Sequence, residues 1–392
     1  MKYHTTALFL GILLLVPGLG YSENEDFTRQ LNFGGYISTY LYKNNVDSGS
    51  PLAFSLSSDP SFVVSKLDTF VESKFAPNWR FFGEIEFVYT PYGYSTSTTP
   101  GSQTSSRDAT NFVFQNPLTT KTQQNNGLII QRAFVDYTVN DLLSFRVGQY
   151  LTPFGIWNED HGDPILTSIT LPYSVSTVTY AQAMAGAQTF GKWFASEAVS
   201  LSYNAYIGNG DGTQPFGANP GGTFSGGGRV QADLFDALTL NASYYYGDLS
   251  YGQAGSGKFT VTSAVNRSTY GGGLKFSLAN FVLQVEEIFD DPHVVTGPTV
   301  VAPGTGTAPP NGTQSLFYAQ AEYTIWDIFT PYARYERVQT TSFTGNIGAG
   351  GVNIHILPQV VFKTDGSFVN FETSTNKLQD FTRVSAGLTV LF

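Results

Sequence analysis

The sequence predicts an all-β protein, a transmembrane antiparallel β-barrel of sixteen strands that closes as a single domain. Alternating apolar and polar residues recur in stretches of about ten residues along the chain, as expected for membrane-crossing strands. The connections between these stretches are alternately short and long. Beyond the N-terminus, no apolar run reaches the roughly 18–20 residues that a membrane helix needs. A chain with this pattern would cross a bilayer with strands.

The clearest hairpin covers residues 128–151. In 128–139, Val135 and Tyr137 fall on one side of the predicted strand, and Arg132 and Asp136 fall on the other. A short turn follows, and 142–151 repeats the alternation of apolar and polar side chains. One face of the hairpin is therefore suited to lipid and the other to water.

The same pattern places the other strands and their connections. The expected strands are, in chain order, residues 31–42, a strand ending near Phe75, 79–89, 128–139, 142–151, 181–193, 198–208, two meeting at Asp236, two meeting at Ala279-Asn280, two meeting at Trp326-Asp327, 348–357, a strand ending near Phe371, and 379–392. The longer loops include 91–126, 152–180, 209–223, 248–266 and 291–313. All short turns then lie on one side of the membrane, together with both termini.

The N-terminus is typical of a secretory signal. Lys2 precedes an apolar run over 7–16, a Pro17-Gly18 break, and small residues before a cleavage site after about residue 22. We therefore expect residues 1–22 to be a signal peptide and 23–392 to form the barrel. An exported barrel with tight turns on one side predicts the bacterial outer membrane, with short periplasmic turns and long external loops.

Composition excludes several functions. The chain has no cysteine, so disulfides and thiolate metal sites play no part. Its net charge is −10, which argues against nucleic acid as a partner and favours cations in a water-filled passage. No serine has a diagnostic catalytic motif, so we expect no enzyme activity. We also expect no cofactor.

The final strand carries a further signal. Val384, Ala386, Leu388 and Val390 form an apolar face that ends beside the terminal Phe392. Arg383, Ser385 and Thr389 form the polar face. A terminal aromatic residue on an amphipathic last strand resembles the assembly signal of bacterial outer-membrane barrels.

Together with this ending, the segment FRVGQYLTPFGIWN at 145–158 resembles bacterial general or substrate-selective porins. The stretches RVGQYLTPFG and GVNIHILPQVVFK are similar in layout to the phosphate-selective porin family. The resemblance implies a sixteen-stranded barrel, commonly a trimer, whose third external loop folds inward and narrows the passage. By that order, residues 152–180 would be the constriction loop. Phosphate-selective porins place many lysines and arginines along the passage, whereas this loop has none.

The candidate site residues follow from the loop and the polar faces. The presumed constriction carries Glu159, Asp160, His161 and Asp163. These could hold a metal ion, but a solvated acidic loop explains them better, so no metal site is predicted. The charged side chains expected to line the passage are Arg80, Glu84, Glu86, Arg132, Asp136, Arg146, Arg229, Lys275, Glu322, Arg334, Glu336 and Arg383.

These observations predict an outer-membrane porin that lets small hydrophilic solutes and ions diffuse passively, with a weak preference for cations. Its expected partners are outer-membrane lipid, the solutes themselves and two further copies in a homotrimer. Alternatives are a substrate-selective channel of the phosphate or anion type, and a structural or adhesion barrel with a plugged interior. An outer-membrane hydrolase is a third class that an assay of lipid or peptide cleavage would detect.

Overall fold

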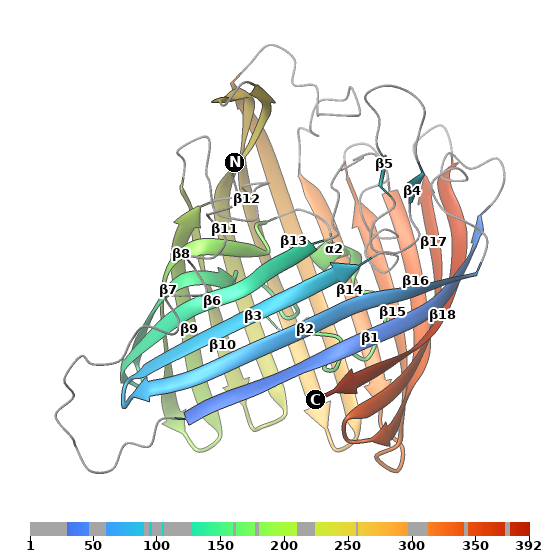
Figure 1. The fold of residues 1–392 in the computed structure, drawn as a ribbon, viewed down its shortest axis with the longest axis horizontal. Coiled ribbons are helices and arrows are strands. Elements are labelled where there is room, and N and C mark those ends of the chain that lie inside the picture. The colour runs from blue at the N-terminus through green and yellow to red at the C-terminus, as the bar shows by residue number, and fades with distance from the viewer. Residues whose placement is uncertain are drawn as a thin grey trace, which may run out of the picture.

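The computed structural model is a closed barrel of sixteen antiparallel strands, each hydrogen-bonded to its neighbours in sequence (Figure 1). The structure describes residues 30–46, 60–89, 94–95, 104–105, 127–159, 162–176, 180–209, 224–255, 258–296, 313–340, 344–372 and 377–392. The predicted fold class and strand number are confirmed. The proposed signal peptide, 1–22, lies outside the described residues. Within the described ranges, no helix is long and apolar enough to cross a membrane.

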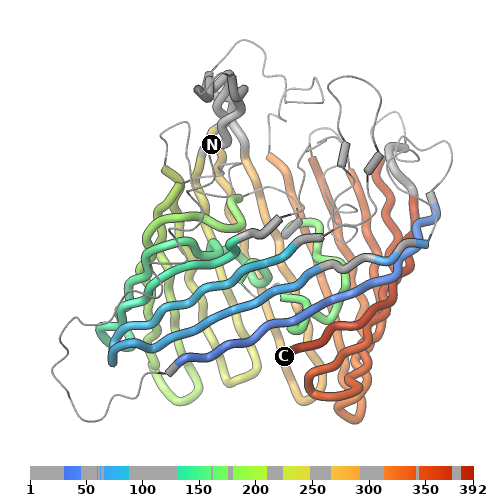
Figure 2. The backbone as a smooth tube through the Cα atoms, in the orientation of Figure 1, coloured from blue at the N-terminus to red at the C-terminus, as the bar shows by residue number. Residues whose placement is uncertain are grey.

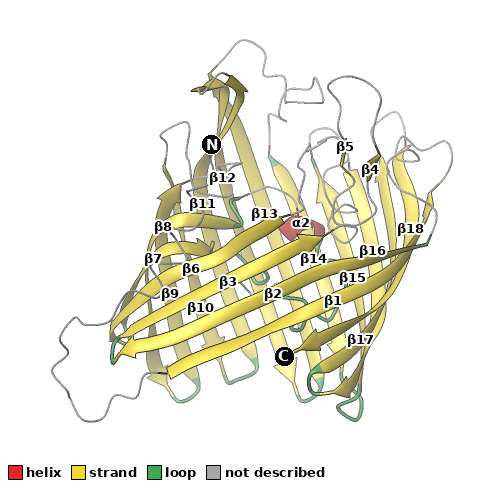
Figure 3. Ribbon diagram, viewed as in Figure 1, coloured by secondary structure: helices red, strands yellow, loops and turns green. Residues whose placement is uncertain are grey.

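The barrel strands are long and tilted, as Figure 3 shows in yellow. Their bounds are β1 Gln30–Val46, β2 Ser61–Ala76, β3 Trp79–Tyr89, β6 Gly127–Asn140, β7 Leu143–Leu151, β8 Ala183–Ser196, β9 Val199–Asn209, β10 Phe224–Leu234, β11 Leu238–Gly255, β12 Lys258–Leu278, β13 Phe281–Thr296, β14 Gln314–Tyr323, β15 Phe329–Gln339, β16 Thr344–Leu357, β17 Val360–Glu372 and β18 Lys377–Leu391. Among the described residues, the short helix α2 covers Tyr173–Ser176.

Side-chain alternation separates the two faces of the barrel. In β1, Phe33 is 76% exposed on the outside, whereas Tyr36 and Tyr40 are 5% and 2% exposed on the inside. In β18, Val384 is 66% exposed while its neighbour Arg383 is 2% exposed. Large apolar side chains pointing outward would be unfavourable in water but match a hydrocarbon surrounding. The outer surface is therefore suited to a bilayer.

Closure joins the two ends of the sheet. β1 pairs with β18 from Tyr36↔Leu391 to Val46↔Phe381. Gly35 and Phe392 extend this pairing, each donating its backbone N–H to the other's carbonyl oxygen at 3.0 Å. Figure 2 shows the red C-terminal strand lying beside the blue first strand. No strand edge of the barrel is left for hydrocarbon, which offers no hydrogen-bond partner.

The tight turns occur where the sequence predicted them. Asp236, Ala279, Trp326 and Asp327 have positive φ angles of 54°, 50°, 53° and 58°. These residues lie in the two-residue β12–β13 turn and in the three-residue β10–β11 and β14–β15 turns. Tight hairpin turns commonly use a positive φ to match the twist of their strands. The β16–β17 turn falls at residues 358–359, also as expected.

Three of the expected loops contain additional strand structure, and β13 extends to Thr296 within the predicted loop 291–313. β11 and β12 pair as far as Gly255↔Lys258, through much of the predicted loop 248–266. The segment 258–265 is rich in β-branched residues, which favours strand over loop. Within 91–126, β4 (Tyr94–Ser95) and β5 (Thr104–Ser105) form a separate two-stranded sheet. These parts of the loop predictions were wrong.

Candidate functional site

The described residues of 152–180, in the connection between β7 and β8, contact the inner wall of the barrel, and we call them the inner loop. They are residues 152–159, 162–176 and 180. Phe154, Trp157 and Ile169 are at most 5% exposed. The Phe154 ring stacks on Tyr180 at 4.4 Å, and Trp157 meets Tyr318 of β14 edge-on at 6.1 Å. The first contact joins the two ends of the loop, and the second, together with Tyr180 against Tyr245 of β11, holds the loop against the inner wall.

Three groups of polar contacts fasten the inner loop to the wall. The first involves its N-terminal part. Ile156 donates its backbone N–H to Glu286 Oε1 of β13 at 3.0 Å, and Glu159 pairs with Arg229 of β10 at 2.6 Å. Gly155, with φ 67°, makes this approach possible, because the Glu286 carboxylate fills the space that a Cβ would take. The charges of Glu159 and Arg229 therefore neutralise each other.

The second group lies on β15. The Arg334 guanidinium donates to Ser168 Oγ at 2.9 Å and to the Thr170 carbonyl oxygen at 2.8 Å. It also pairs with Glu336 at 2.8 Å, and Glu336 accepts the Tyr173 backbone N–H at 2.5 Å. The side chains of Arg334 and Glu336 are 0% and 1% exposed. Buried charges are stable only when paired and hydrogen-bonded in this way.

The third group lies on β17 and β1. Lys363 donates to the carbonyl oxygens of Asp163 and Leu166, the latter at 2.5 Å. Tyr40 donates its hydroxyl to Asp163 Oδ2 at 3.0 Å. The inner loop thus reaches the wall on both sides of the β1–β18 closure.

Burial also affects the tyrosines of the loop itself. It raises the pKa of Tyr180 well above its ordinary value, and the nearby Glu286 charge adds to the shift. Burial likewise raises the pKa of Tyr173, with a further contribution from Glu336. Both phenols therefore stay neutral at physiological pH and cannot contribute charge to a passage.

The wall formed by β2, β3, β6 and β7 carries a ladder of ion pairs. Arg80 pairs with Glu72 at 2.7 Å, and Arg146 binds both oxygens of Asp136 at 2.7 and 3.1 Å. Arg132 pairs with Glu84. The side chains of Arg80, Arg132 and Arg146 are 38%, 28% and 15% exposed. We call this set of ion pairs the wetted ladder because its three arginines are partly exposed, whereas Arg334 and Glu336 beneath the inner loop are not.

Phenylalanine rings support the same ladder. The Arg146 guanidinium lies 3.8 Å from the Phe134 ring centre, and that of Arg132 lies 4.7 Å from Phe82. Phe82 and Phe134 stack at 5.5 Å. Cation–π contacts hold the guanidinium planes in place while leaving their edges accessible.

The structure divides the predicted site residues into groups. Arg80, Arg132, Asp136 and Arg146 meet in the wetted ladder with Glu84, and Gln131 donates to Glu86. Arg229, Glu322, Arg334 and Glu336 instead contact the inner loop, Glu322 accepting from Thr167 Oγ1 at 2.5 Å. Arg383 is buried against Asn44 and Tyr42, and Lys275 is exposed near the short turns.

The predicted loop residues are also separated. Glu159 and Asp163 contact different parts of the wall, on β10 and β1. Asp160 and His161 lie outside the described residues. Among the residues that are described, no group of three or more Asp, Glu or His side chains is arranged to hold a metal ion.

Sequence reasoning missed Lys363 and Asp365 of β17. Asp365 accepts hydrogen bonds from the backbone N–H of Ile169 at 3.2 Å and from Thr170 Oγ1 at 3.2 Å. A signal was present, because Val361, Lys363 and Asp365 alternate with outward residues in the predicted strand.

A closed, sixteen-stranded barrel with an apolar exterior and an inward-folded loop is a membrane barrel of the bacterial outer-membrane type. Solved structures agree. The fold is similar to OmpT, an outer membrane protein of Vibrio cholerae in trimer form, with a TM-score of 0.59 and 13% identity, covering 93% of this chain and 100% of that one.

Two further structures extend the likeness. The anion-selective porin from Comamonas acidovorans has a TM-score of 0.55 at 10% identity, covering 93% of this chain and 100% of that one. The outer membrane channel DcaP of Acinetobacter baumannii has a TM-score of 0.56 at 10% identity, covering 93% and 97%. No protein-family model and no curated protein sequence matches the chain. The comparisons therefore establish a porin-like barrel fold, and the layout of the phosphate-selective family stays an expectation.

Proposed function

We propose that the protein is an outer-membrane porin through which small hydrophilic solutes and ions diffuse down their gradients. The observation that carries the proposal is the wetted ladder, in which arginine side chains up to 38% exposed line the inside of a closed barrel. Water that reaches these groups fills part of the interior. No catalytic step is part of this proposal.

The position of the inner loop indicates where a passage through the barrel would lie. The loop is fastened over β10–β17 and to β1, and the ladder lies on β2, β3, β6 and β7. Solutes would pass between the loop and the ladder. Such an arrangement selects by bore and by the charges that face the water.

We retain the weak cation preference as a prediction that rests on the net charge of −10. Its structural support is small, because Glu159 is paired with Arg229 and Asp163 is 5% exposed. An anion-type channel is the second candidate, favoured by the three wetted arginines of the ladder. Each has a carboxylate partner, so either preference should be weak.

Assembly as a homotrimer is also part of the proposal. It draws support from the fold shared with the trimer form of the Vibrio cholerae protein.

Planar-bilayer recording of the purified protein tests the proposal. A porin gives stepwise, ohmic conductance in KCl, and the reversal potential in a salt gradient separates cation from anion preference. Folded, inserted protein that gives no conductance would favour the plugged structural or adhesion barrel instead.

A further inference from the structure

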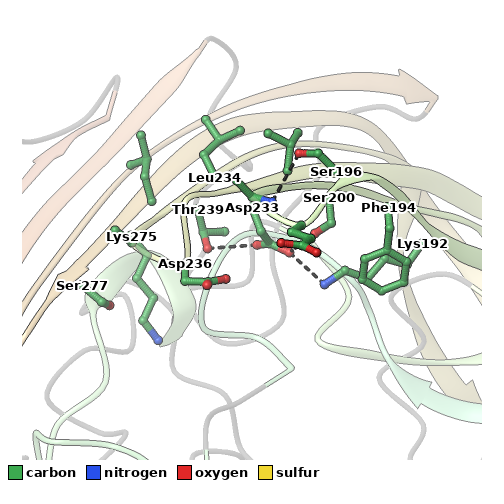
Figure 4. Close-up of a pocket in the computed structure, with 15 residues that line it drawn as sticks. Lys192, Phe194, Ser196, Ser200, Asp233, Leu234, Asp236, Thr239, Lys275 and Ser277 are labelled. Carbon is green, nitrogen blue, oxygen red and sulfur yellow. Dashed lines mark hydrogen bonds and ion pairs between the residues drawn. The ribbon is translucent and has the colours of Figure 1, made fainter.

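A cavity opens at the short-turn end of the barrel, between the inner faces of β8 to β12, and has a volume of about 370 Å³. Ser200, Asp233, Thr239 and Lys275 lie on directly paired positions of β9, β10, β11 and β12, so they form one row across the wall. In Figure 4, Lys192 and Phe194 border one side of the cavity, and Lys275 and Ser277 border the other.

Asp233, at the centre of the row, is already satisfied. It accepts from Lys192 Nζ and Ser200 Oγ at 3.1 Å each, and from Thr239 Oγ1 at 3.0 Å. Gln231 Nε2 donates at 2.9 Å to Oδ1, the oxygen that also accepts from Thr239, while Lys192 and Ser200 donate to Oδ2. With four donors around it, Asp233 lines the cavity as a fixed, neutralised group and offers little attraction to a cation.

Three other charged residues line the cavity, Glu197, Asp236 and Lys275, and in the described part of the chain none of them forms an ion pair. Lys275 is exposed, and the residues paired with it on either side, Thr239 and Gln284, are neutral. Asp236 is exposed on the β10–β11 turn. Figure 4 shows Lys275 and Asp236 on the same side of the cavity, although they form no ion pair with each other.

We propose that this cavity is a docking subsite for small zwitterionic solutes of the amino-acid type at the short-turn mouth of the barrel. The Lys275 ammonium receives the solute carboxylate, and the Asp236 carboxylate receives the solute ammonium. A zwitterion can bridge two opposite charges that do not reach each other, whereas a simple ion satisfies one and leaves the other. The hydroxyl groups of the row supply neutral hydrogen bonds. This proposal rests on the proposed porin function, because solute reaches the subsite through the barrel.

The test measures binding of L-alanine to the full-length protein in detergent by ligand-observed NMR titration. Acetate and methylammonium, each carrying one of the two charges, serve as comparison probes. We expect saturable alanine binding that Lys275→Met and Asp236→Asn each weaken about fivefold, the effect of losing one exposed charge contact. Lys74→Met is the matched control, because Lys74 is an exposed lysine near a short turn outside the cavity.

Absence of saturable alanine binding, or acetate or methylammonium binding as tightly as alanine, would overturn the proposal. So would equal weakening by the Lys74 variant. Conductance of each variant in KCl is recorded in parallel and shows that the barrel is intact. Conductance without alanine binding would refute the proposed subsite but not the proposed porin function. Alanine binding without conductance would refute the porin function but support the subsite.

Discussion

Arg334→Met should release the inner loop from β15. The wild-type guanidinium donates to Glu336, Ser168 and Thr170 in a site with no exposed side-chain surface. Removing it leaves the Glu336 carboxylate buried without its ion-pair partner, which costs roughly 3–5 kcal/mol. The barrel strands keep their own hydrogen bonds, so we expect this cost to appear as local opening of the loop.

Hydrogen exchange of the loop amides measures that opening. At about 1.4 kcal/mol for each factor of ten, a loss of about 3 kcal/mol raises the open population roughly a hundredfold. The backbone amides of Ile169 and Tyr173, which bond to Asp365 and Glu336, should exchange correspondingly faster. Noise in single-channel current should increase as the loop fluctuates.

Two variants make the test specific. Arg337→Met removes an exposed arginine from the same strand and should leave loop exchange unchanged. Arg334→Met combined with Glu336→Met removes both buried charges and should open the loop less than Arg334→Met alone. Unchanged exchange of residues 168–173 in Arg334→Met would refute the reasoning.

Three further predictions follow from other contacts. Gly155→Ala forces a non-glycine residue to φ 67° beside Glu286 and should weaken loop attachment by about 1–3 kcal/mol, seen as faster exchange at Ile156, whereas Gly162→Ala should have no such effect. Glu159→Gln removes the partner of Arg229 and should move the reversal potential toward anions. An unchanged potential would contradict the position of this pair at the passage, and outward Glu287→Gln is the control. Val384→Arg places a charge on the lipid face and should lower the free energy of unfolding by about 2–4 kcal/mol in denaturant titration. An unchanged free energy of unfolding would show that this face does not contact lipid.

Alternation and turn chemistry were enough to predict the barrel. In a sheet with lipid on one side and water on the other, a shift of one residue would reverse every side chain, so the pattern in strands such as β1 and β18 is unambiguous. The turns at Asp236 and Trp326-Asp327 could be placed because they interrupt that pattern.

The interior could be predicted only in part. Alternation assigns Arg80 and Arg334 equally to the inner face, but it does not show which of them the inner loop covers. That distinction depends on contacts between residues more than 160 positions apart, such as Arg334 with Ser168 and Thr170. The buried role of Lys363 has the same origin, because its partners are loop carbonyl oxygens that carry no sequence signal.

The chain's lack of cysteine permits a direct test of the central claim, that water and ions pass along the ladder. A single cysteine is introduced by Arg132→Cys on the wetted wall, and Val147→Cys, at an outward position 64% exposed, is the control. A bulky water-soluble thiol reagent is added during planar-bilayer recording. We predict a stepwise drop in conductance for Arg132→Cys and none for Val147→Cys. Full modification of Cys at position 132 without any change in conductance would contradict the account.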